Sequence, residues 1–148
     1  MKKSFFVALS LMLMLLGAAA VQAAAVITVQ VEILGGFSID CSDLFNFGAV
    51  MPGQSIEETL ELKVWSNRAW DLYVSCIGPV EVPGTLEVED QRGLWQDVAS
   101  SSRLVLWDQT ATGSEGSVVH IPFRLSTSYA DAPGEYEFQI EFTVVPSL

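Results

Sequence analysis

Apolar and polar residues alternate with a period of two along much of this 148-residue chain, and no window keeps a helical period. The alternation is cleanest between residues 135 and 144, where one phase is apolar and the other is polar or acidic. Successive side chains of a strand point to opposite faces, so the pattern predicts a strand with one buried face. Its inward residues are Tyr136, Phe138, Ile140, Phe142 and Val144.

The stretch Ser55–Cys76 repeats this pattern twice, on either side of the polar turn Ser66-Asn67-Arg68. We expect a hairpin of two half-buried strands, with Trp70 in the core. The apolar phase of the pair contains Ile56, Leu60, Leu62 and Val64, followed by Trp70, Leu72, Val74 and Cys76.

Shorter alternating or apolar segments predict strands at 25–33, 37–41, 44–50, 85–89, 103–107 and 117–125. Pro52-Gly53 and Pro133-Gly134 predict turns, and residues 90–102 predict a loop. Pro122 places its strand at an edge or a bulge, because proline has no amide donor. Roughly seven to nine short strands predict an all-β fold, an immunoglobulin-like two-sheet β-sandwich of antiparallel strands, with a closed barrel as the alternative.

The chain begins with the layout of a secretory signal peptide: a pair of lysines, an apolar run over residues 5–16, and small residues before a cleavage point. We expect residues 1–23 to be removed, with cleavage after Ala25 as the alternative, and residues 24–148 to form a single domain. No later segment approaches the roughly 20 apolar residues of a membrane-spanning helix. The predicted protein is therefore secreted, and we expect it at a cell surface or in a periplasm.

Acidic residues dominate the charge: 18 Asp and Glu stand against 7 Lys and Arg, and two of the lysines belong to the predicted signal peptide. Such a chain repels nucleic acid and anionic lipid headgroups. We therefore exclude nucleic acid as a partner and interpret the charge as a source of solubility outside the cell.

Cys41 and Cys76 are the only cysteines, and export places them in an oxidising compartment. We predict one disulfide between them. In the chain-entropy model, the closed loop contributes about 3 to 4 kcal/mol to stability. The bond ties the start of the domain to the end of the predicted hairpin.

Residues suited to catalysis are scarce. His120 is the only histidine and falls on the polar phase of its strand, where we expect it to face solvent. The sequence has no nucleophile elbow, phosphate loop or His-rich metal motif, so we predict no enzymatic activity and no cofactor. Glu87, Glu89 and Asp90, at a strand end, are candidate oxygen ligands for calcium, although the EF-hand spacing is absent.

Four tryptophans are many for a chain of this length. Trp70 is assigned to the core, whereas Trp65 is on a polar phase, Trp95 in a predicted loop and Trp107 at a strand end. Exposed aromatic side chains bind sugars and protein partners, so these last three are the candidate binding surface. The alternative is that they cap the open ends of the sandwich.

The segment 67–75, Asn-Arg-Ala-Trp-Asp-Leu-Tyr-Val-Ser, resembles the first signature of WxL domains, which are secreted bacterial β-sandwich modules. Phe47-Gly48 falls where those domains often carry this pair. Pro133-Gly134-Glu135-Tyr136 is similar to their closing Gly-x-Tyr strand, and Phe142-Thr143-Val144 to their second Trp-x-Leu, with phenylalanine and valine in place of tryptophan and leucine. The resemblance implies non-covalent attachment to the cell wall.

A second resemblance uses the cysteines. Spore coat protein U-type and fimbrial subunits have features similar to Cys41, Phe47-Gly48, Pro52-Gly53, Cys76 and Pro133-Gly134-Glu135-Tyr136. Many such subunits polymerise by lending a strand to a neighbour, which implies a donor role for Val26–Ile33. The alternative is that Val26–Ile33 is the first strand of its own domain.

Two hypotheses for function follow. The first is a non-enzymatic adhesion or cell-wall-associated binding module, whose partner is a wall polymer or a surface protein. The second is a structural subunit of a surface filament or coat that self-assembles by strand exchange through Val26–Ile33.

Overall fold

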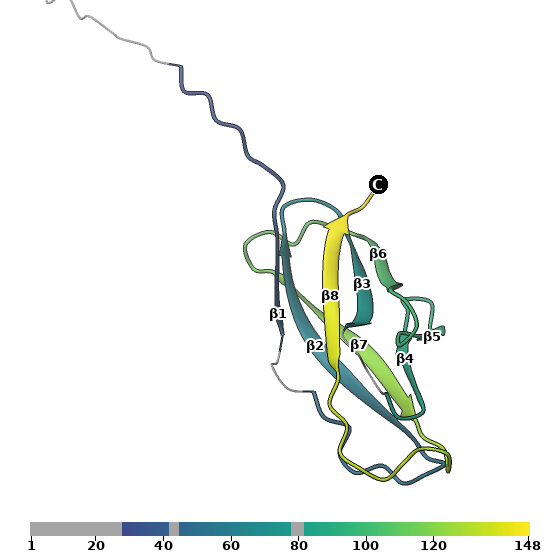
Figure 1. Ribbon diagram of the computed structural model, residues 1–148. Coiled ribbons are helices and arrows are strands. Elements are labelled where there is room, and N and C mark those ends of the chain that lie inside the picture. Colours follow the sequence, from purple (N-terminus) through teal and green to yellow (C-terminus); the bar gives the residue numbers. More distant parts are fainter. Residues whose placement is uncertain (1–27, 42–44, 78–81) are drawn as a thin grey trace, which may run out of the picture. The chain divides into compact units, whose positions relative to one another are not determined.

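The structure is a computed structural model that describes residues 28–41, 45–77 and 82–148, so the predicted signal peptide lies outside the described residues (Figure 1). The chain divides into two units, residues 1–33 and 34–148. Within the described ranges, no helix has the length and apolar character that crossing a bilayer requires. The strands are β1 (Phe37–Cys41), β2 (Ser55–Ser66), β3 (Trp70–Ile77), β4 (Thr85–Glu89), β5 (Trp95–Asp97), β6 (Arg103–Gln109), β7 (Ser117–Ser126) and β8 (Gln139–Pro146).

The eight strands form two sheets. One has five strands in the order β1-β2-β7-β4-β5, and the other has three in the order β6-β3-β8. All pairs of neighbouring strands are antiparallel. This arrangement confirms the predicted all-β class and two-sheet β-sandwich, with a strand number inside the predicted range.

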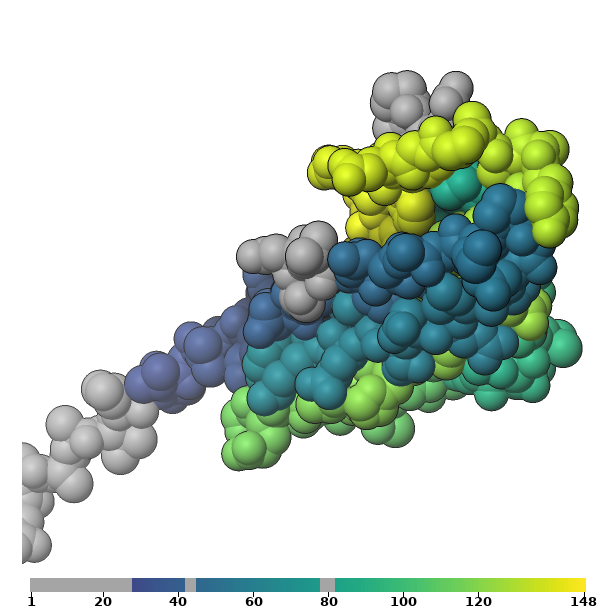
Figure 2. All heavy atoms as spheres, turned by 90° about the horizontal axis from the view of Figure 1, so that it is seen from below, coloured from purple at the N-terminus to yellow at the C-terminus, as the bar shows by residue number. Residues whose placement is uncertain are grey.

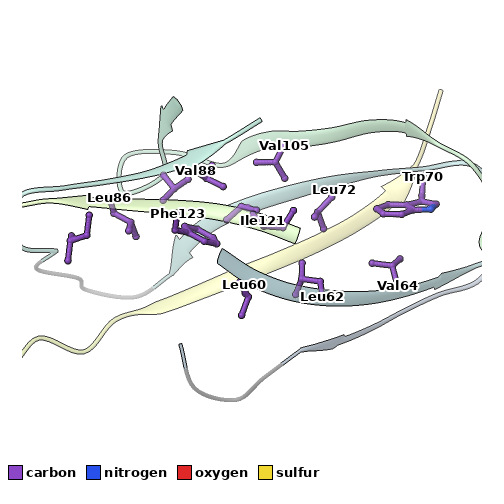
Figure 3. Close-up of a cluster of buried hydrophobic side chains, with 13 residues drawn as sticks. Leu60, Leu62, Val64, Trp70, Leu72, Leu86, Val88, Val105, Ile121 and Phe123 are labelled. Atoms are coloured by element: carbon purple, nitrogen blue, oxygen red, sulfur yellow. The ribbon is translucent and has the colours of Figure 1, made fainter. Parts of the chain in front are cut away.

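The core lies between the sheets, where the apolar phases of the strands meet (Figure 3). Burying one aliphatic or aromatic side chain contributes about 1.5–3 kcal/mol, so this cluster is the main stabilising feature. Trp70 is 1% exposed, and its indole N–H donates to the Thr110 carbonyl oxygen at 3.0 Å. The other fully buried side chains include Leu62, Val64, Leu72, Val74, Leu86, Val88, Val105, Ile121 and Phe123.

Residues 55–66 and 70–77 are strands with the predicted inward faces, but they do not form the predicted hairpin. β2 pairs with β1 and β7, whereas β3 pairs with β6 and β8 in the other sheet. Both inward faces bury against the same core, which places the two strands across the sandwich from each other. Ser66 stabilises the connection from one sheet to the other. Its amide donates to Thr112 Oγ1 at 2.8 Å, and its hydroxyl donates to the Arg68 carbonyl oxygen.

Several predicted boundaries differ from the observed ones. Residues 45–50 form no strand, although Phe45 and Phe47 pack edge to face with ring centroids 5.0 Å apart. The predicted loop 90–102 contains the short strand β5, and the closing strand begins at Gln139 rather than at residue 135. Short apolar runs next to turns do not by themselves determine whether the backbone finds a ladder partner.

Pro122 is not in an edge strand, because β7 lies between β2 and β4. The β4 register nevertheless ends at Phe123, so Pro122 has a strand partner only on the β2 side, at Thr59. The local environment is therefore that of an edge, which explains how an otherwise central strand tolerates a residue without an amide donor.

The strand predicted at 25–33 is not a strand in its described part, which begins at Thr28. Residues 28–36 have no regular structure, and Val29, Val31 and Ile33 are 79%, 79% and 82% exposed. A strand needs a hydrogen-bonded neighbour, and neither sheet includes this segment. The prediction of a strand at 25–33 is therefore wrong for residues 28–33, and whether this segment pairs within its own copy or with another stays a prediction.

Candidate functional site

The two sheets end in four edge strands, and two of these are short or irregular. β5 has only three residues, and Arg103 Nε donates to the Asp97 carbonyl oxygen beside it at 2.6 Å. The register of β6 with β3 shifts along the pair, and Asp108 of β6 has a φ of 54°. Short and bulged edges resist pairing with a further strand.

The turn between β4 and β5 also covers β6. The Gln91 amide donates to the Val105 carbonyl oxygen at 2.9 Å, and its side-chain oxygen accepts the Trp107 amide at 3.0 Å. The Arg92 guanidinium lies 4.9 Å from the centroid of the Trp107 ring. Backbone groups on this side of β6 are thus bonded within the chain.

β8 is the longest edge strand, and it has strand partners on one side only among the described residues. It runs beside β3 from Gln139 to Pro146 without a register shift. Three inward side chains of β8 are only half-buried although they pack against the core: Ile140, Phe142 and Val144. A long regular edge with a half-buried apolar row is a template for another strand.

β1, the edge of the five-stranded sheet, lies next to β8 (Figure 1). Its inward residues Phe37 and Ile39 are also half-buried against the core. Half-buried apolar side chains are therefore present on both of these neighbouring edge strands.

The segment 28–33 has an exposed apolar row of its own. Its apolar phase, Val29, Val31 and Ile33, is exposed, and its other phase is polar. At about 3.3 Å per residue, six extended residues span roughly 20 Å, which fits along a strand of the length of β8. Exposed apolar rows of this kind mark interaction sites.

Sequence reasoning placed Ile140, Phe142 and Val144 on an inward face, which the structure confirms. The donor role of Val26–Ile33 stays a prediction. Sequence reasoning did not find that β8 is an edge, because alternation reports the buried face of a strand and not the order of strands in a sheet.

The three tryptophans predicted as one binding surface are dispersed. Trp65 on β2 and Trp95 on β5 belong to the five-stranded sheet but are separated by β7 and β4, and Trp107 is on β6 of the other sheet. All three are half-buried, and each has a cation of the chain over its ring. Those cations are Lys63, Arg124 and Arg92, at 5.0, 4.2 and 4.9 Å from the respective ring centroids.

The candidate calcium ligands Glu87, Glu89 and Asp90 are not grouped so that they could hold one metal ion. Glu87 Oε2 accepts two hydrogen bonds from Arg124, at 2.8 and 3.0 Å, and Arg124 also lies 3.8 Å from Glu57. Across the described residues, no group of three or more His, Cys, Asp or Glu side chains is placed to hold a metal ion. Glu87 therefore serves in an ion pair with Arg124 rather than with Glu89 and Asp90 in a cation site.

Asp90 is a buried carboxylate that organises the turn between β4 and β5. Its Oδ1 accepts the amides of Arg92 at 2.8 Å and Leu94 at 3.1 Å, and its Oδ2 accepts the Gln96 side-chain amide at 3.0 Å. Desolvation raises the pKa of Asp90, but the two amide hydrogen bonds and the Arg92 guanidinium outweigh it and hold the pKa below its usual range. The carboxylate stabilises the turn.

Cys41 and Cys76 are both free thiols, so the predicted disulfide is not formed in this structure. Cys41 is exposed at the end of β1, whereas Cys76 is half-buried on β3, and these strands belong to opposite sheets. Burial raises the pKa of the Cys76 thiol, and the Asp97 carboxylate raises it further. Cys76 is therefore protonated at neutral pH and a poor nucleophile.

His120 is exposed on β7, as predicted, and lies opposite Glu61 of β2. It is the only histidine of the sequence, and it lies on the outer face of the five-stranded sheet. Its place in the fold is that of a solvated side chain.

A shallow cavity of about 400 Å³ lies beside the loop 127–134, which is yellow-green in Figure 2. The Asp131 carboxylate in its wall accepts the Gly84 amide at 2.8 Å and the Ser128 amide. The bond from the Ser128 amide lowers the pKa of Asp131. The cavity wall consists of Val82, Pro83, Gly84, Ala99, Ala130, Asp131, Ala132 and Tyr136.

No protein-family model matches this sequence, and no curated protein matches it.

Proposed function

We propose that this protein is a structural subunit that assembles by strand exchange, in which the segment Val26–Ile33 of one copy pairs with the β8 edge of the next. One observation carries the proposal: the chain has an exposed, alternating segment outside both sheets and a long, regular edge whose inward side chains are half-buried. The segment lacks a hydrogen-bonded neighbour and the β8 edge lacks a strand on one side, so pairing the two would provide both.

The expected energetics support an exchange that covers side chains on both partners. Burying Val29, Val31 and Ile33 contributes roughly 5–9 kcal/mol in total. Association costs about 4–15 kcal/mol in lost translational and rotational freedom, so burial of the segment alone gives little net stability. The half-buried row of β8, together with backbone hydrogen bonds of about 0.5–1.5 kcal/mol each, supplies the difference.

Such pairing is head to tail, because the segment and the edge are different surfaces of the same chain. A heterologous contact that does not close into a ring produces an open filament. The resemblance to spore coat protein U-type and fimbrial subunits supports this architecture, and the signal-like N-terminus supports its assembly outside the cytoplasm, on a bacterial surface or in a periplasm.

The other hypothesis, a cell-wall-associated binding module, has less support. It relies on Trp65, Trp95 and Trp107, which are dispersed over two sheets and stacked by cations of the same chain. A flat aromatic platform for a sugar polymer needs free ring faces on one surface.

The test is the molar mass of the mature chain, residues 24–148, measured by light scattering over a range of concentrations. We expect a ladder of multiples of the monomer mass that shifts to larger species as the concentration rises. Val31→Asp should leave monomers, because it places a charge in the row that pairing buries.

Gln30→Asp is the matched control. It adds the same charge to the polar phase of the same segment, and it should keep the ladder. A wild-type protein that is monomeric at every concentration, or two variants with the same distribution, would contradict strand exchange.

A further inference from the structure

The turn between β2 and β3 holds the chain just before β1. The Asn67 side-chain oxygen accepts the Gly36 amide at 3.0 Å, and its side-chain nitrogen donates to the Leu34 carbonyl oxygen at 2.8 Å. One carboxamide thus uses both its acceptor and its donor on the backbone of residues 34–36. These two bonds hold residues 34–36 against the β2–β3 turn.

The same end of the sandwich contains the end of β8. Phe37 at the start of β1 pairs with Ser66, and Pro146 at the end of β8 pairs with Trp70. A chain that enters at Phe37 must therefore reverse direction within residues 34–36 before it can lie along β8 of its own copy. Pairing of the segment with β8 of its own copy requires this reversal, whereas pairing with a second copy does not.

Gly35-Gly36 is the sequence that a tight reversal would use, since two-residue hairpin turns need positive φ angles. Neither glycine is among the residues with positive φ. A side chain at position 35 would lie 2.9 Å from Cδ of Arg68, so Gly35 serves a close contact with the β2–β3 turn. The doublet is held by that turn rather than folded back.

We infer that Asn67 is a positioning residue for assembly: by holding Leu34 and Gly36 it prevents the segment from folding onto β8 of its own copy and leaves it for a second copy of this chain. The inference rests on the proposed strand exchange, and it adds that the segment pairs with a second copy rather than with its own. A segment paired with β8 of its own copy would occupy that edge, and no further subunit could then add to the filament. A subunit that polymerises must therefore disfavour self-pairing.

The experiment compares the full mature chain with Asn67→Ala in two measurements, the ratio of monomer to oligomer and the protease protection of residues 28–33 within the isolated monomer. Two lost hydrogen bonds shift the balance between open and self-paired monomer about tenfold or more toward the self-paired form, which raises that ratio. We also expect the segment to be protected in the variant monomer, because it then pairs with its own edge. A merely structural role would not produce a protected segment.

Asn46→Ala is the matched control, because the Asn46 side chain also bonds a nearby backbone amide, that of Gly48 at 2.7 Å, but away from the exit of the segment. If Asn67→Ala does not fold, as judged by circular dichroism, Asn67→Asp decides, because it keeps an acceptor for Gly36 and loses the donor to Leu34.

An Asn67 variant that matches Asn46→Ala in both measurements, beside a wild-type protein that oligomerises, overturns the role of Asn67 and leaves strand exchange intact. A wild-type protein without oligomers refutes strand exchange itself, and with it this inference.

Discussion

The ring of Phe142 on the open edge strand β8 packs edge to face on the buried ring of Phe123, with centroids 6.3 Å apart and planes at 84°. The edge is therefore continuous with the core, since a half-buried side chain on β8 touches a fully buried one on β7. A strand that covers β8 also completes the burial of the core on this side.

Phe142→Ala should destabilise the monomer by about 2 kcal/mol, less than the 3–5 kcal/mol typical of a fully buried phenylalanine, because the ring is half exposed before assembly. Urea unfolding in the monomeric Val31→Asp background measures this value. Thr143→Ala, at the neighbouring exposed position, is the control and should change stability little. Equal losses in the two variants would show that β8 is not packed on the core.

Gly84 and Gly113 both have positive φ angles, but only at Gly84 would a side chain also clash with neighbouring backbone atoms. Their φ angles are +67° and +66°, so alanine at either position costs about 1–2 kcal/mol. At Gly84 the added Cβ would also clash with the Ser126 carbonyl oxygen, whereas at Gly113 it meets nothing within 4 Å. We expect Gly84→Ala to lower the thermal midpoint much more than Gly113→Ala, and similar midpoints would contradict this packing.

The lowered pKa of Asp90 predicts an acid-dependent stability. A carboxyl whose folded pKa is depressed stabilises the protein above its unfolded pKa of about 3.9, and this contribution is lost as the pH falls through the folded pKa. Asp90→Asn should therefore lower the thermal midpoint at neutral pH, and its difference from wild type should shrink in acid. Asp40→Asn, at an exposed position of β1, is the control; a pH-independent effect of Asp90→Asn would contradict the linkage.

The disulfide stays a prediction from the sequence, since both thiols are free in the structure. In protein collected from an oxidising compartment, we expect alkylation of the denatured chain to modify neither cysteine before reduction and both after it. The bond would then stabilise the domain by about 3 to 4 kcal/mol relative to Cys41→Ser. Alkylation of both thiols without reduction would show that the free-thiol state is the native one.

The sequence predicts which side chains of a strand face the core better than it predicts which strands pair with each other. Leu62, Val64, Leu72 and Val74 are buried as the alternation predicts, because a period of two directly determines which side chains share a face. The hairpin prediction failed because adjacency along the chain does not determine whether two strands pair or face each other across the core.

The segment 28–33 shows the same limit. Val29 and Val31 alternate as regularly as the residues of β2, yet they are exposed, because alternation shows that a strand can bury one face and does not name the partner. The dispersion of the three candidate tryptophans has a related cause: Arg124 reaches Trp95 from a strand distant in sequence, and nothing in the local pattern of either residue indicates the contact.

Hydrogen–deuterium exchange of the assembled wild-type chain, compared with monomeric Val31→Asp, tests strand exchange most directly. Paired amides are protected and unpaired ones exchange freely. We predict that residues 28–33 and β8 both become protected in the assembly, while β5 exchanges equally in the two proteins. Rapid exchange of residues 28–33 in assembled wild-type protein would contradict the central claim.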